Sequence, residues 1–452
     1  MPDPVPNLTT AQTGPLLSFE QRLLDRAADI EAWFRAQWQR SAPPFYGSVD
    51  LRNAGFKLAP VDTNLFPAGF NNLNPAFEAL CVQAIQAALT RIMPSACGVL
   101  LVPENHTRNR HYLENVAVLQ SLIEHAGYKV RIGSLRPELK APETLALPSG
   151  RTLKLEPIVR EGERVKVEGF SPCLVLLNND LSGGRPAILE NLRQPVIPPL
   201  ALGWSNRLKS RHFAIYHEVA AEFGALLGID PWLVEPLSRN CGQINFMKRE
   251  GEECLAANVA LLLEDIRAKY AEYGVTEEPF VIVKADAGTY GMGVMTVKSP
   301  DEVRHLNRDA RKKMAATKEG REVTGAIIQE GVYTFERWVE QPWPGDPPAE
   351  ASDGYTAEPV VYMIDRYVVG GFYRVHSGRS NIENLNAPGA EFRPLAFAEA
   401  CSHPDCTKAP DARPNRFYAY GVVARLALLA AAREIAAAQE REPGVTVAVA
   451  AA

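Results

Sequence analysis

The sequence predicts an α/β protein in which short buried strands alternate with amphipathic helices. Two stretches carry this prediction. Residues 97–132 have the pattern of a β-α-β unit, and residues 280–297 have the pattern of two strands joined by a glycine-rich loop. With 452 residues, the chain is long enough for a large hydrophobic core and for two or three domains.

The β-α-β unit begins with the apolar run Cys97–Pro103, which predicts a buried strand. Helical periodicity follows from about Tyr112 to His125, and a second strand at Tyr128–Ile132 completes the unit. In open α/β sheets, ligands bind beyond the carboxyl ends of the strands. The residues directly after the first strand are therefore candidates for a ligand crevice.

That crevice would be lined by the polar segment Glu104–Arg110. A second buried strand, Cys173–Leu177, ends in the similarly polar segment 178–184, and both segments could serve one ligand. The candidate substrate-binding residues of the first segment are Glu104, Asn105 and Arg108.

The other predicted elements follow from periodicity and from turn residues. Helices are expected at Pro15–Ser41, 76–93, Phe213–Leu227, 245–273, 299–314 (after the capping-box pattern Ser-Pro-Asp-Glu) and 416–440. Strands are expected in hairpins between 137 and 169, at Ala326–Val332, and in a hairpin at Pro359–Val375 that turns at Asp365 and Arg366.

Composition and charge exclude several classes of protein. The formal net charge is −5, so we expect no nucleic acid partner. The sequence has no apolar run long enough to cross a bilayer, and its first residues lack the basic start and apolar core of a signal peptide. Seven scattered cysteines favour a reducing compartment over a disulfide framework. We therefore expect a cytoplasmic protein with no membrane partner, which could form a homo-oligomer.

One local group of residues resembles a zinc site. Cys401 and Cys406 flank His403, but no second pair of ligands lies at a suitable spacing. We interpret the cysteines as free thiols in a loop.

The stretch 280–297 predicts a phosphate site. An apolar β-branched run leads to Lys284, and a loop with three glycines and a second β-rich run follow. Glycines let backbone N–H groups approach an anion closely, and the lysine adds positive charge. The alternative is an ordinary glycine-rich hairpin, although burying an unpaired lysine at the end of a strand would be costly. The glycines are Gly288, Gly291 and Gly293.

The order of these glycines excludes two common phosphate motifs. A Walker loop needs Gly-x-x-x-x-Gly-Lys-Ser/Thr, and a dinucleotide fingerprint needs Gly-x-Gly-x-x-Gly running into a helix. Here the order is Gly-x-x-Gly-x-Gly, and the Met-Thr-Val that soon follows is strand-like. An NAD-dependent oxidoreductase is therefore a poor interpretation.

Two further stretches are rich in polar side chains. Ser48–Leu73 carries charges of both signs among aromatic residues and glycines, which suggests a site for a small zwitterion or a structural loop with Asx turns. Residues 201–212 form a basic cluster that either faces an anion or is solvated. The candidate substrate-binding residues in the two stretches are Asp50, Arg52, Asn64, Asn71, Asn206 and Arg207.

The order of elements in the second half of the chain resembles the ATP-grasp fold, and within it bacterial glutathione synthetase. The order is a lysine, a helix, a strand ending in lysine, a glycine loop and a strand ending in Gln-Glu-Gly-Val. As a whole, the chain resembles the proteobacterial glutamate–cysteine ligase family. The strings Val-Lys-Ala-Asp-Ala-Gly-Thr-Tyr-Gly-Met-Gly-Val and Asn-Ile-Glu-Asn-Leu-Asn-Ala-Pro-Gly carry this resemblance, which covers most of the chain.

The resemblance implies an N-terminal α/β substrate-binding (pre-ATP-grasp-like) domain at 16–240 and an ATP-grasp domain at 241–435. Within the second domain it implies a glycine lid at 284–297, a hinge at 326–332 and a mobile loop at 341–358. Residues 1–15 and 436–452 are expected to be a disordered arm and tail.

The resemblance also implies roles for individual residues. Lys248 and Lys284 would contact the nucleotide, the lid would cover its phosphates, the hinge would pair with adenine, and Glu358 would reach the ribose or a metal. Arg374 and Arg379, with Lys284, would act on the transferring phosphate and the substrate carboxylate, beside Asn384 and Asn386. The lid and hinge residues are Gly288, Thr289, Tyr290, Gly291, Met292, Gly293, Gln329, Glu330, Gly331 and Val332.

Magnesium is the cofactor implied beside ATP, but its ligands depart from the glutathione synthetase pattern. That enzyme has a late strand with an aspartate and then a Glu-x-Asn pair, and no such string follows Gly389. The nearest oxygen ligands are Glu383, Asn384 and Asn386, with Glu330, Glu358 or Asp365 as alternatives.

The activity that the resemblance implies is the first step of glutathione biosynthesis. ATP would phosphorylate the γ-carboxylate of L-glutamate, and the amine of L-cysteine would then attack the γ-glutamyl phosphate. Such chemistry needs cations, N–H donors and exclusion of water rather than a protein nucleophile. The alternatives are a glutathione synthetase-like or other ATP-grasp carboxylate–amine ligase, and a nucleotide-binding protein without catalytic activity.

Overall fold

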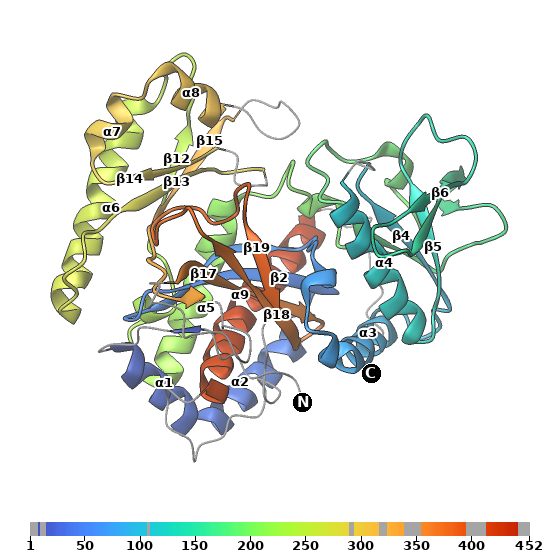
Figure 1. Ribbon diagram of the computed structural model, residues 1–452, viewed down its shortest axis with the longest axis horizontal. Helices are drawn as coiled ribbons and strands as arrows, with labels where there is room; N and C mark the ends of the chain where they lie inside the picture. The colour runs from blue at the N-terminus through green and yellow to red at the C-terminus, as the bar shows by residue number, and fades with distance from the viewer. Residues whose placement is uncertain are drawn as a thin grey trace, which may run out of the picture.

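The computed structural model describes residues 8–9, 15–105, 109–288, 293–315, 323–338, 354–394 and 413–441. Over these residues the protein is a mixed α/β structure whose main strands form sheets of seven, six and four strands. Figure 1 shows the four-stranded and six-stranded sheets in separate lobes on either side of a central part that holds the seven-stranded sheet.

The central sheet joins segments from both ends of the chain. Its strands run in the order β1-β16-β17-β18-β19, and β2 pairs with β17 and with β3. The predicted hairpin at 359–375 is confirmed, because β17 and β18 are antiparallel and turn at Asp365 and Arg366. The bounds are β1 Leu8–Thr9, β2 Tyr46–Asn53, β3 Leu58–Asn64, β16 Arg337–Trp338, β17 Tyr355–Ile364, β18 Tyr367–His376 and β19 Glu391–Pro394.

The six-stranded sheet contains the predicted β-α-β unit. Strands β4 and β5 are parallel, and α4 connects them; the predicted hairpins at 137–169 are also present. The sheet order is β11-β10-β4-β5-β7-β6. The bounds are α3 Glu78–Ile92, β4 Gly98–Pro103, α4 Arg110–His125, β5 Lys129–Ser134, β6 Glu143–Ala146, β7 Thr152–Pro157, β8 Val159–Glu161, β9 Arg164–Lys166, β10 Leu174–Asn178 and β11 Val196–Ile197.

The four-stranded sheet contains the strand, glycine loop and strand that the sequence predicts. Its order is β12-β15-β13-β14, and β13 pairs antiparallel with both β14 and β15. Helices α6, α7 and α8 lie in the same lobe (Figure 1). The bounds are β12 Ser238–Gln243, α6 Glu252–Tyr273, β13 Val281–Ala285, β14 Val294–Val297, α7 Pro300–Arg304, α8 Arg308–Ala315 and β15 Gly325–Glu330.

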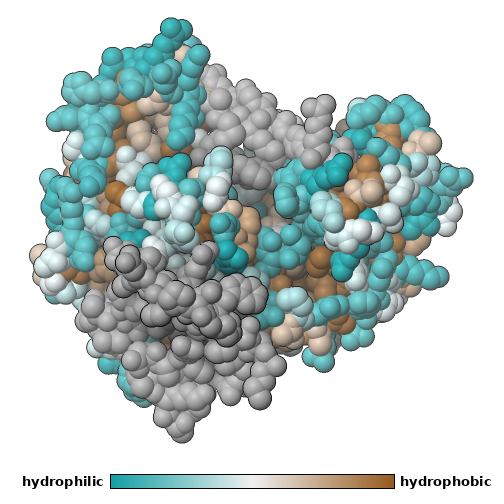
Figure 2. All heavy atoms as spheres, in the orientation of Figure 1, coloured by the Kyte–Doolittle hydropathy of each residue, from teal (hydrophilic) through white to brown (hydrophobic). Residues whose placement is uncertain are grey.

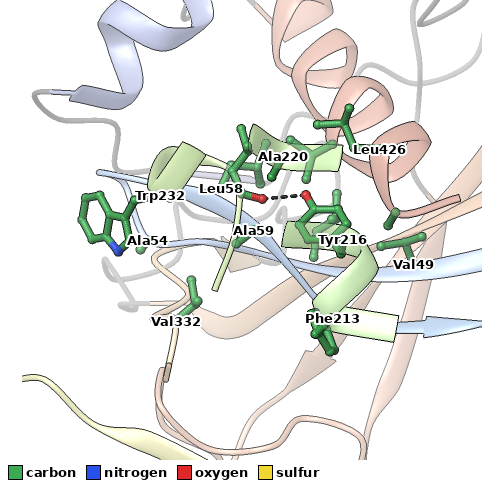
Figure 3. Packing of buried hydrophobic residues seen from close by; sticks show 14 of the residues in the cluster. Val49, Ala54, Leu58, Ala59, Phe213, Tyr216, Ala220, Trp232, Val332 and Leu426 are labelled. Atoms are coloured by element: carbon green, nitrogen blue, oxygen red, sulfur yellow. Dashed lines mark hydrogen bonds between the residues drawn. The ribbon is translucent and has the colours of Figure 1, made fainter. Parts of the chain in front are cut away.

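One large core connects the central part with the four-stranded sheet. It receives side chains from α1 (Pro15–Asp25), α2 (Ala27–Arg40), α5 (Lys209–Leu227) and α9 (Arg413–Arg441). Figure 3 shows the part of this core where Val49 of β2, Leu58 of β3, Tyr216 of α5 and Leu426 of α9 meet. The predicted domain boundary near residue 240 stays a prediction, because this core extends on both sides of it.

Several predicted element bounds are wrong. The helix expected from 245 begins at Glu252, because Asn245 and Glu250 close a tight turn and Gly251 adopts a left-handed backbone conformation. The helix expected at Pro15–Ser41 is two helices separated by Arg26. The helix after Ser299 is also split in two, and the side chain of Ser299 makes no capping hydrogen bond.

Two stretches expected to lack regular structure contain it. Strand β17 begins at Tyr355, inside the predicted mobile loop 341–358, so Glu358 is a strand residue. Helix α9 extends to Arg441, which confirms the helix predicted at 416–440 and shows that the predicted tail 436–452 began too early. Residues 339–353 and 442–452 lie outside the described residues, as do Cys401, His403 and Cys406.

Hydrophilic residues cover much of the outer surface of the two upper lobes on the face shown in Figure 2. Among the described helices, none combines the length and the apolar character that a membrane span requires.

Candidate functional site

A pocket lies where the central sheet faces the four-stranded sheet. It draws polar side chains from β2, β3, β13, β15, β17, β18 and the first turn of α5. The lining residues are Asp50, Arg52, Val61, Asp62, Lys209, Ile282, Lys284, Ala285, Gly288, Val294, Gln329, Glu330, Val332, Glu358, Arg374, Ile382, Asn384 and Asn386.

Two arginines and two carboxylates of the central sheet form a continuous chain of ion pairs on one side of the pocket. Arg374 Nη1 donates to Glu358 Oε1 at 2.6 Å and to Asp50 Oδ2 at 2.9 Å. Arg52 Nε donates to the other oxygen of Glu358 at 3.0 Å. Arg52 also donates to the backbone oxygens of Val332 and Glu383, so these guanidinium groups are held in place by the protein itself.

Two lysines face the pocket without a carboxylate partner among the described residues. Lys284 Nζ donates to Gln329 Oε1 at 2.6 Å and to Val61 O at 2.7 Å, and Lys209 Nζ donates to Gly288 O at 2.5 Å. Within the described part of the chain, no carboxylate oxygen lies within 4.0 Å of either ammonium group. Because a buried unpaired cation is costly, this arrangement is suited to an anionic ligand.

The charges in the pocket shift the pKa values of its lysines and carboxylates. Burial lowers the pKa of Lys284 to about 8, and the nearby charges of Lys209 and Arg52 act in the same direction. Burial also lowers the pKa of Lys209. Burial works against ionisation of Asp62, but the charges of Lys209 and Lys284 outweigh it and hold the pKa of Asp62 below its ordinary value.

On the opposite side of the pocket, burial decides the pKa of one residue and neighbouring charges decide that of another. Burial raises the pKa of Asp50 despite the nearby charge of Arg374, and the carboxylate of Glu358 adds to the rise. Burial also works against the charge of Arg374, but Asp50 and Glu358 outweigh it and raise the pKa of Arg374. The guanidinium group therefore remains charged at any pH at which the protein is folded.

The glycine loop is anchored at its root to helix α5. Asp286 accepts hydrogen bonds from Ser210 N at 2.7 Å and Ser210 Oγ at 2.6 Å, and Asp286 O accepts from Lys209 N at 2.8 Å. These contacts satisfy N–H groups at the start of α5. They explain why the helix begins at Lys209 rather than at the predicted Phe213, and they bring Lys209 against Gly288.

The position of the end of β15, at the expected hinge, is fixed by buried contacts on the side that faces away from the pocket. The carboxylate of Glu330 accepts from Lys57 Nζ at 2.8 Å and from Trp232 Nε1, and the side chains of Lys57 and Glu330 are fully buried. Gly331 N donates to Phe280 O at 2.8 Å. A Cβ atom on Gly331 would lie 2.1 Å from the Phe280 ring, so only glycine fits there.

The pocket therefore collects residues that the sequence analysis singled out in distant stretches. Eleven candidates line it, namely Asp50, Arg52, Lys284, Gly288, Gln329, Glu330, Val332, Glu358, Arg374, Asn384 and Asn386. Gly293 directly precedes β14, and Gly331 directly follows β15. Thr289, Tyr290, Gly291, Met292 and Arg108 lie outside the described residues.

Other candidates lie away from this pocket. Lys248 is exposed, and Arg379 and Glu383 line a neighbouring pocket with Asn384, where they form a 2.7 Å ion pair. Arg207 is buried and paired with Glu434 and His212. The candidates Asn64, Asn71, Glu104, Asn105 and Asn206 also lie outside the residues that line the central pocket.

Of the residues expected to bind magnesium, Glu383 has both carboxylate oxygens engaged by the protein itself. Magnesium prefers carboxylate oxygens that are free to coordinate it. Glu383 Oε1 accepts from Arg379 at 2.7 Å, and Oε2 accepts from Ser380 N and Oγ; the Ser380 N–H and Arg379 hold the pKa of Glu383 at about 2. Among the described residues, no three His, Cys, Asp or Glu side chains gather in a way that could hold a metal ion.

Two charged pocket residues were not among the candidates from the sequence. Lys209 belongs to the predicted basic cluster, but the sequence analysis selected its neighbours Asn206 and Arg207. Asp62 lies in the polar stretch 48–73, between the chosen Asp50 and Asn64. Asp62 lies opposite Asp50 of β2, a pairing between strands that the sequence alone does not show, and nothing in the sequence places the start of α5 beside the glycine loop.

The chain was also compared with known proteins. A family model for glutamate–cysteine ligase matches residues 20–435. A solved structure from Methylobacillus flagellatus KT, provisionally named a gamma-glutamylcysteine synthetase, shares 58% sequence identity. It covers 96% of this chain and 99% of its own, with a TM-score of 0.87. A glutathione synthetase-like effector from Globodera pallida, with 10% identity, covers 82% and 83% of the two chains. Its TM-score of 0.35 is too low to bear on the fold. A search among curated proteins gives no significant match.

Proposed function

The chain belongs to the glutamate–cysteine ligase family and is an ATP-dependent ligase, and from this premise we propose that the central pocket binds ATP and L-glutamate side by side. The observation that carries the proposal is the pair formed by the buried Lys209 and the half-buried Lys284, whose ammonium groups face the pocket without an ion-pair partner among the described residues. The phosphates of ATP supply the missing negative charge.

We further propose that the two sheets around the pocket are the two halves of an ATP-grasp fold. In this arrangement the four-stranded sheet carries the glycine loop after β13 and the hinge at the end of β15. The central sheet supplies Arg52, Glu358 and Arg374. The contact of Lys209 with Gly288 supports a loop that rests on α5 and closes over the phosphates.

The residues of the pocket divide into three groups by position. Lys209 and Lys284 lie at the root of the glycine loop and would hold the β- and γ-phosphates. Arg374 lies across the pocket beside Asp50, and it would bind the carboxylate of glutamate that is phosphorylated. Gln329 and Val332 lie at the end of β15, where backbone groups would pair with adenine.

In the proposed reaction, the γ-carboxylate of glutamate attacks the γ-phosphorus of ATP and forms a γ-glutamyl phosphate with release of ADP. The amine of cysteine then attacks the acyl carbon, and phosphate leaves. Negative charge builds on the phosphoryl oxygens in the first step and on the acyl oxygen in the second. Preorganised cations such as Arg374 and Lys284 stabilise this charge without moving.

Magnesium remains a prediction. ATP reaches such enzymes as its magnesium complex, and phosphate oxygens together with water molecules can provide most of the ligands. The described protein residues do not supply a set of free carboxylates, so we assign no ligand and no step to the metal.

The test measures phosphate release from ATP with each amino acid alone and with both together. The proposal expects release that requires both L-glutamate and L-cysteine. Release with γ-glutamylcysteine and glycine instead would assign the neighbouring ligase reaction, and ATP binding without turnover would indicate a nucleotide-binding protein.

The same assay on Lys284→Met tests the site. We expect turnover to fall by about 10²–10³, the usual effect of removing a preorganised donor. Lys298→Met is the matched control, because Lys298 is exposed, follows β14 in the same sheet and pairs with Glu278 at 3.0 Å. Equal turnover in both variants would show that Lys284 has no role in the reaction.

A further inference from the structure

Two cysteine side chains lie against each other at the amino-terminal edge of the six-stranded sheet. Cys97 directly precedes β4, Cys173 directly precedes β10, and these two strands are parallel neighbours. Their Sγ atoms are 3.5 Å apart. Cys97 is exposed and Cys173 is half-buried, so a small molecule in solution can approach the pair.

The backbone holds both residues in place. Cys97 O accepts from Lys129 N at 3.0 Å, and Cys173 N donates to Gly98 O at 2.8 Å. A disulfide bond is about 2 Å long, so the sulfur atoms need to approach by only about 1.5 Å. Rotation of the exposed Cys97 side chain can supply this movement without a change in the sheet.

The two thiols differ in their surroundings. Cys97 N donates to Cys173 Sγ at 3.3 Å. Burial works against a thiolate at Cys173, but the backbone N–H groups of Cys97 and Gly98 outweigh it and lower the pKa of Cys173. The hydrogen bond with Cys173 raises the pKa of Cys97. The N–H of Cys97 points at Cys173 Sγ and would stabilise a thiolate there, so we assign Cys173 as the attacking sulfur and Cys97 as the sulfur that reacts second.

The other described cysteines do not combine a neighbouring thiol, access to solvent and a lowered pKa. Burial raises the pKa of Cys81 to about 12. Cys241 lies beside Cys254, but Cys241 is buried, and burial raises its pKa to about 11. A buried thiol that stays protonated reacts slowly, so the pair of Cys241 and Cys254 serves as an internal comparison.

We propose that Cys97 and Cys173 form a thiol–disulfide exchange site whose oxidant is the disulfide of a low-molecular-weight thiol. The Cys173 thiolate attacks one sulfur of the small disulfide, the S–S bond breaks, and one small thiolate leaves and takes a proton. The Cys97 sulfur then gives up its proton and attacks Cys173 Sγ of the mixed disulfide, and the second small thiol leaves. Two protein thiols are oxidised, and one small disulfide is reduced to two thiols.

This proposal is independent of the residue roles assigned in the pocket. An enzyme of this family works on cysteine, so small thiols and their disulfides meet its surface. The new bond would join residues 76 positions apart in sequence, across two strands that are already paired. It would close the amino-terminal edge of β4 and β10 with no change in their register.

The experiment exposes the reduced full-length protein to cystine, blocks the remaining thiols by alkylation and maps disulfide-linked peptides by mass spectrometry. We expect one peptide pair that links Cys97 to Cys173, with a loss of the mass of two hydrogen atoms that dithiothreitol reverses. In Cys97→Ser, the reaction should stop at a mixed disulfide between Cys173 and cysteine. In Cys173→Ser, both products should fall sharply.

Two controls separate the site from general thiol oxidation. Cys254→Ser should form the linked peptide as the wild type does. The same incubation in concentrated urea removes the folded geometry and should scatter the linkages among the cysteines. Wild-type protein that yields no peptide linking Cys97 to Cys173, or that retains mixed disulfide to the same extent as Cys97→Ser, would overturn the proposal.

Discussion

Arg374 and Glu358 lie directly opposite each other on the antiparallel strands β18 and β17, and Arg374 Nη1 donates to Glu358 Oε1 at 2.6 Å. Glu358 also binds Arg52 of β2, while Arg374 binds Asp50 of the same strand. The two arginines are therefore oriented before any ligand arrives. A ligand carboxylate or phosphate meets cations whose rotamers are already set, which lowers the entropic cost of binding.

The first prediction concerns Arg374. Arg374→Met should lower kcat for phosphate release by about 10²–10³, because it removes a preorganised cation from the reacting groups. Arg366→Met is the control, since Arg366 is exposed at the turn of the same hairpin and stacks on Tyr367. Circular dichroism of both variants distinguishes a lost site from a lost fold, and near-normal turnover of a folded Arg374→Met would exclude its role.

The second prediction concerns Lys209, which the structure brings to the glycine loop. Lys209→Met should raise the Kd for ATP by about ten- to a hundredfold, the range of a hydrogen bond to a charged group. Lys209→Arg keeps the charge and should recover part of the affinity. Titration calorimetry measures both. Unchanged ATP affinity in Lys209→Met would show that the lysine does not bind ATP and serves only its contacts with Gly288 and the Trp204 ring.

The third prediction is a pH dependence of ATP binding. The pKa of Lys284 is about 8 because burial disfavours its charge. Above that pH the ligand-free protein loses the ammonium group, so the Kd for ATP should rise as the pH passes through about 8. ATP binding is measured without the amino acid substrates, because free L-cysteine itself titrates in this pH range. Lys284→Arg should remove this step from the profile, and a wild-type Kd that stays constant from neutral to alkaline pH would contradict the assignment.

Lys284 should also affect stability in the absence of ligand. Its pKa is lower in the folded protein than the ordinary value of 10.5, so the unfolded chain binds more protons between pH 8 and 10.5. The contribution of Lys284 to the free energy of unfolding should therefore increase with pH in that window. Comparison of urea unfolding of the wild type and Lys284→Met across the window measures this contribution, and parallel curves would refute it.

The fourth prediction concerns the buried pair behind the hinge. Lys57→Met leaves the Glu330 carboxylate buried without its cation, so the free energy of unfolding should fall by about 3–5 kcal/mol. Lys57→Met combined with Glu330→Gln removes both charges and should recover part of the loss. Urea denaturation of the two variants measures the difference. A double variant no more stable than Lys57→Met would show that the ion pair itself is not the cause.

The sequence by itself determined most of the regular elements and the family of the chain. Apolar runs and helical periodicity located β4, α4, β5 and the β17–β18 hairpin, because burial on one face imposes a period on the chain. The lysine at the end of β13 and the glycines after it predicted a phosphate loop, and this role stays a prediction. The resemblance of two strings to the glutamate–cysteine ligase family was then confirmed by the match over residues 20–435.

Only the tertiary structure decided which charged residues share the pocket. Arg207 and Lys209 are two positions apart, yet Arg207 is buried against Glu434 whereas Lys209 faces the glycine loop. The difference arises because Asp286, far along the chain, accepts the hydrogen bonds that begin α5 at Lys209. Such a contact has no local signature, since hydrogen bonds between distant segments depend on how the sheets pack and not on the spacing of residues within one segment.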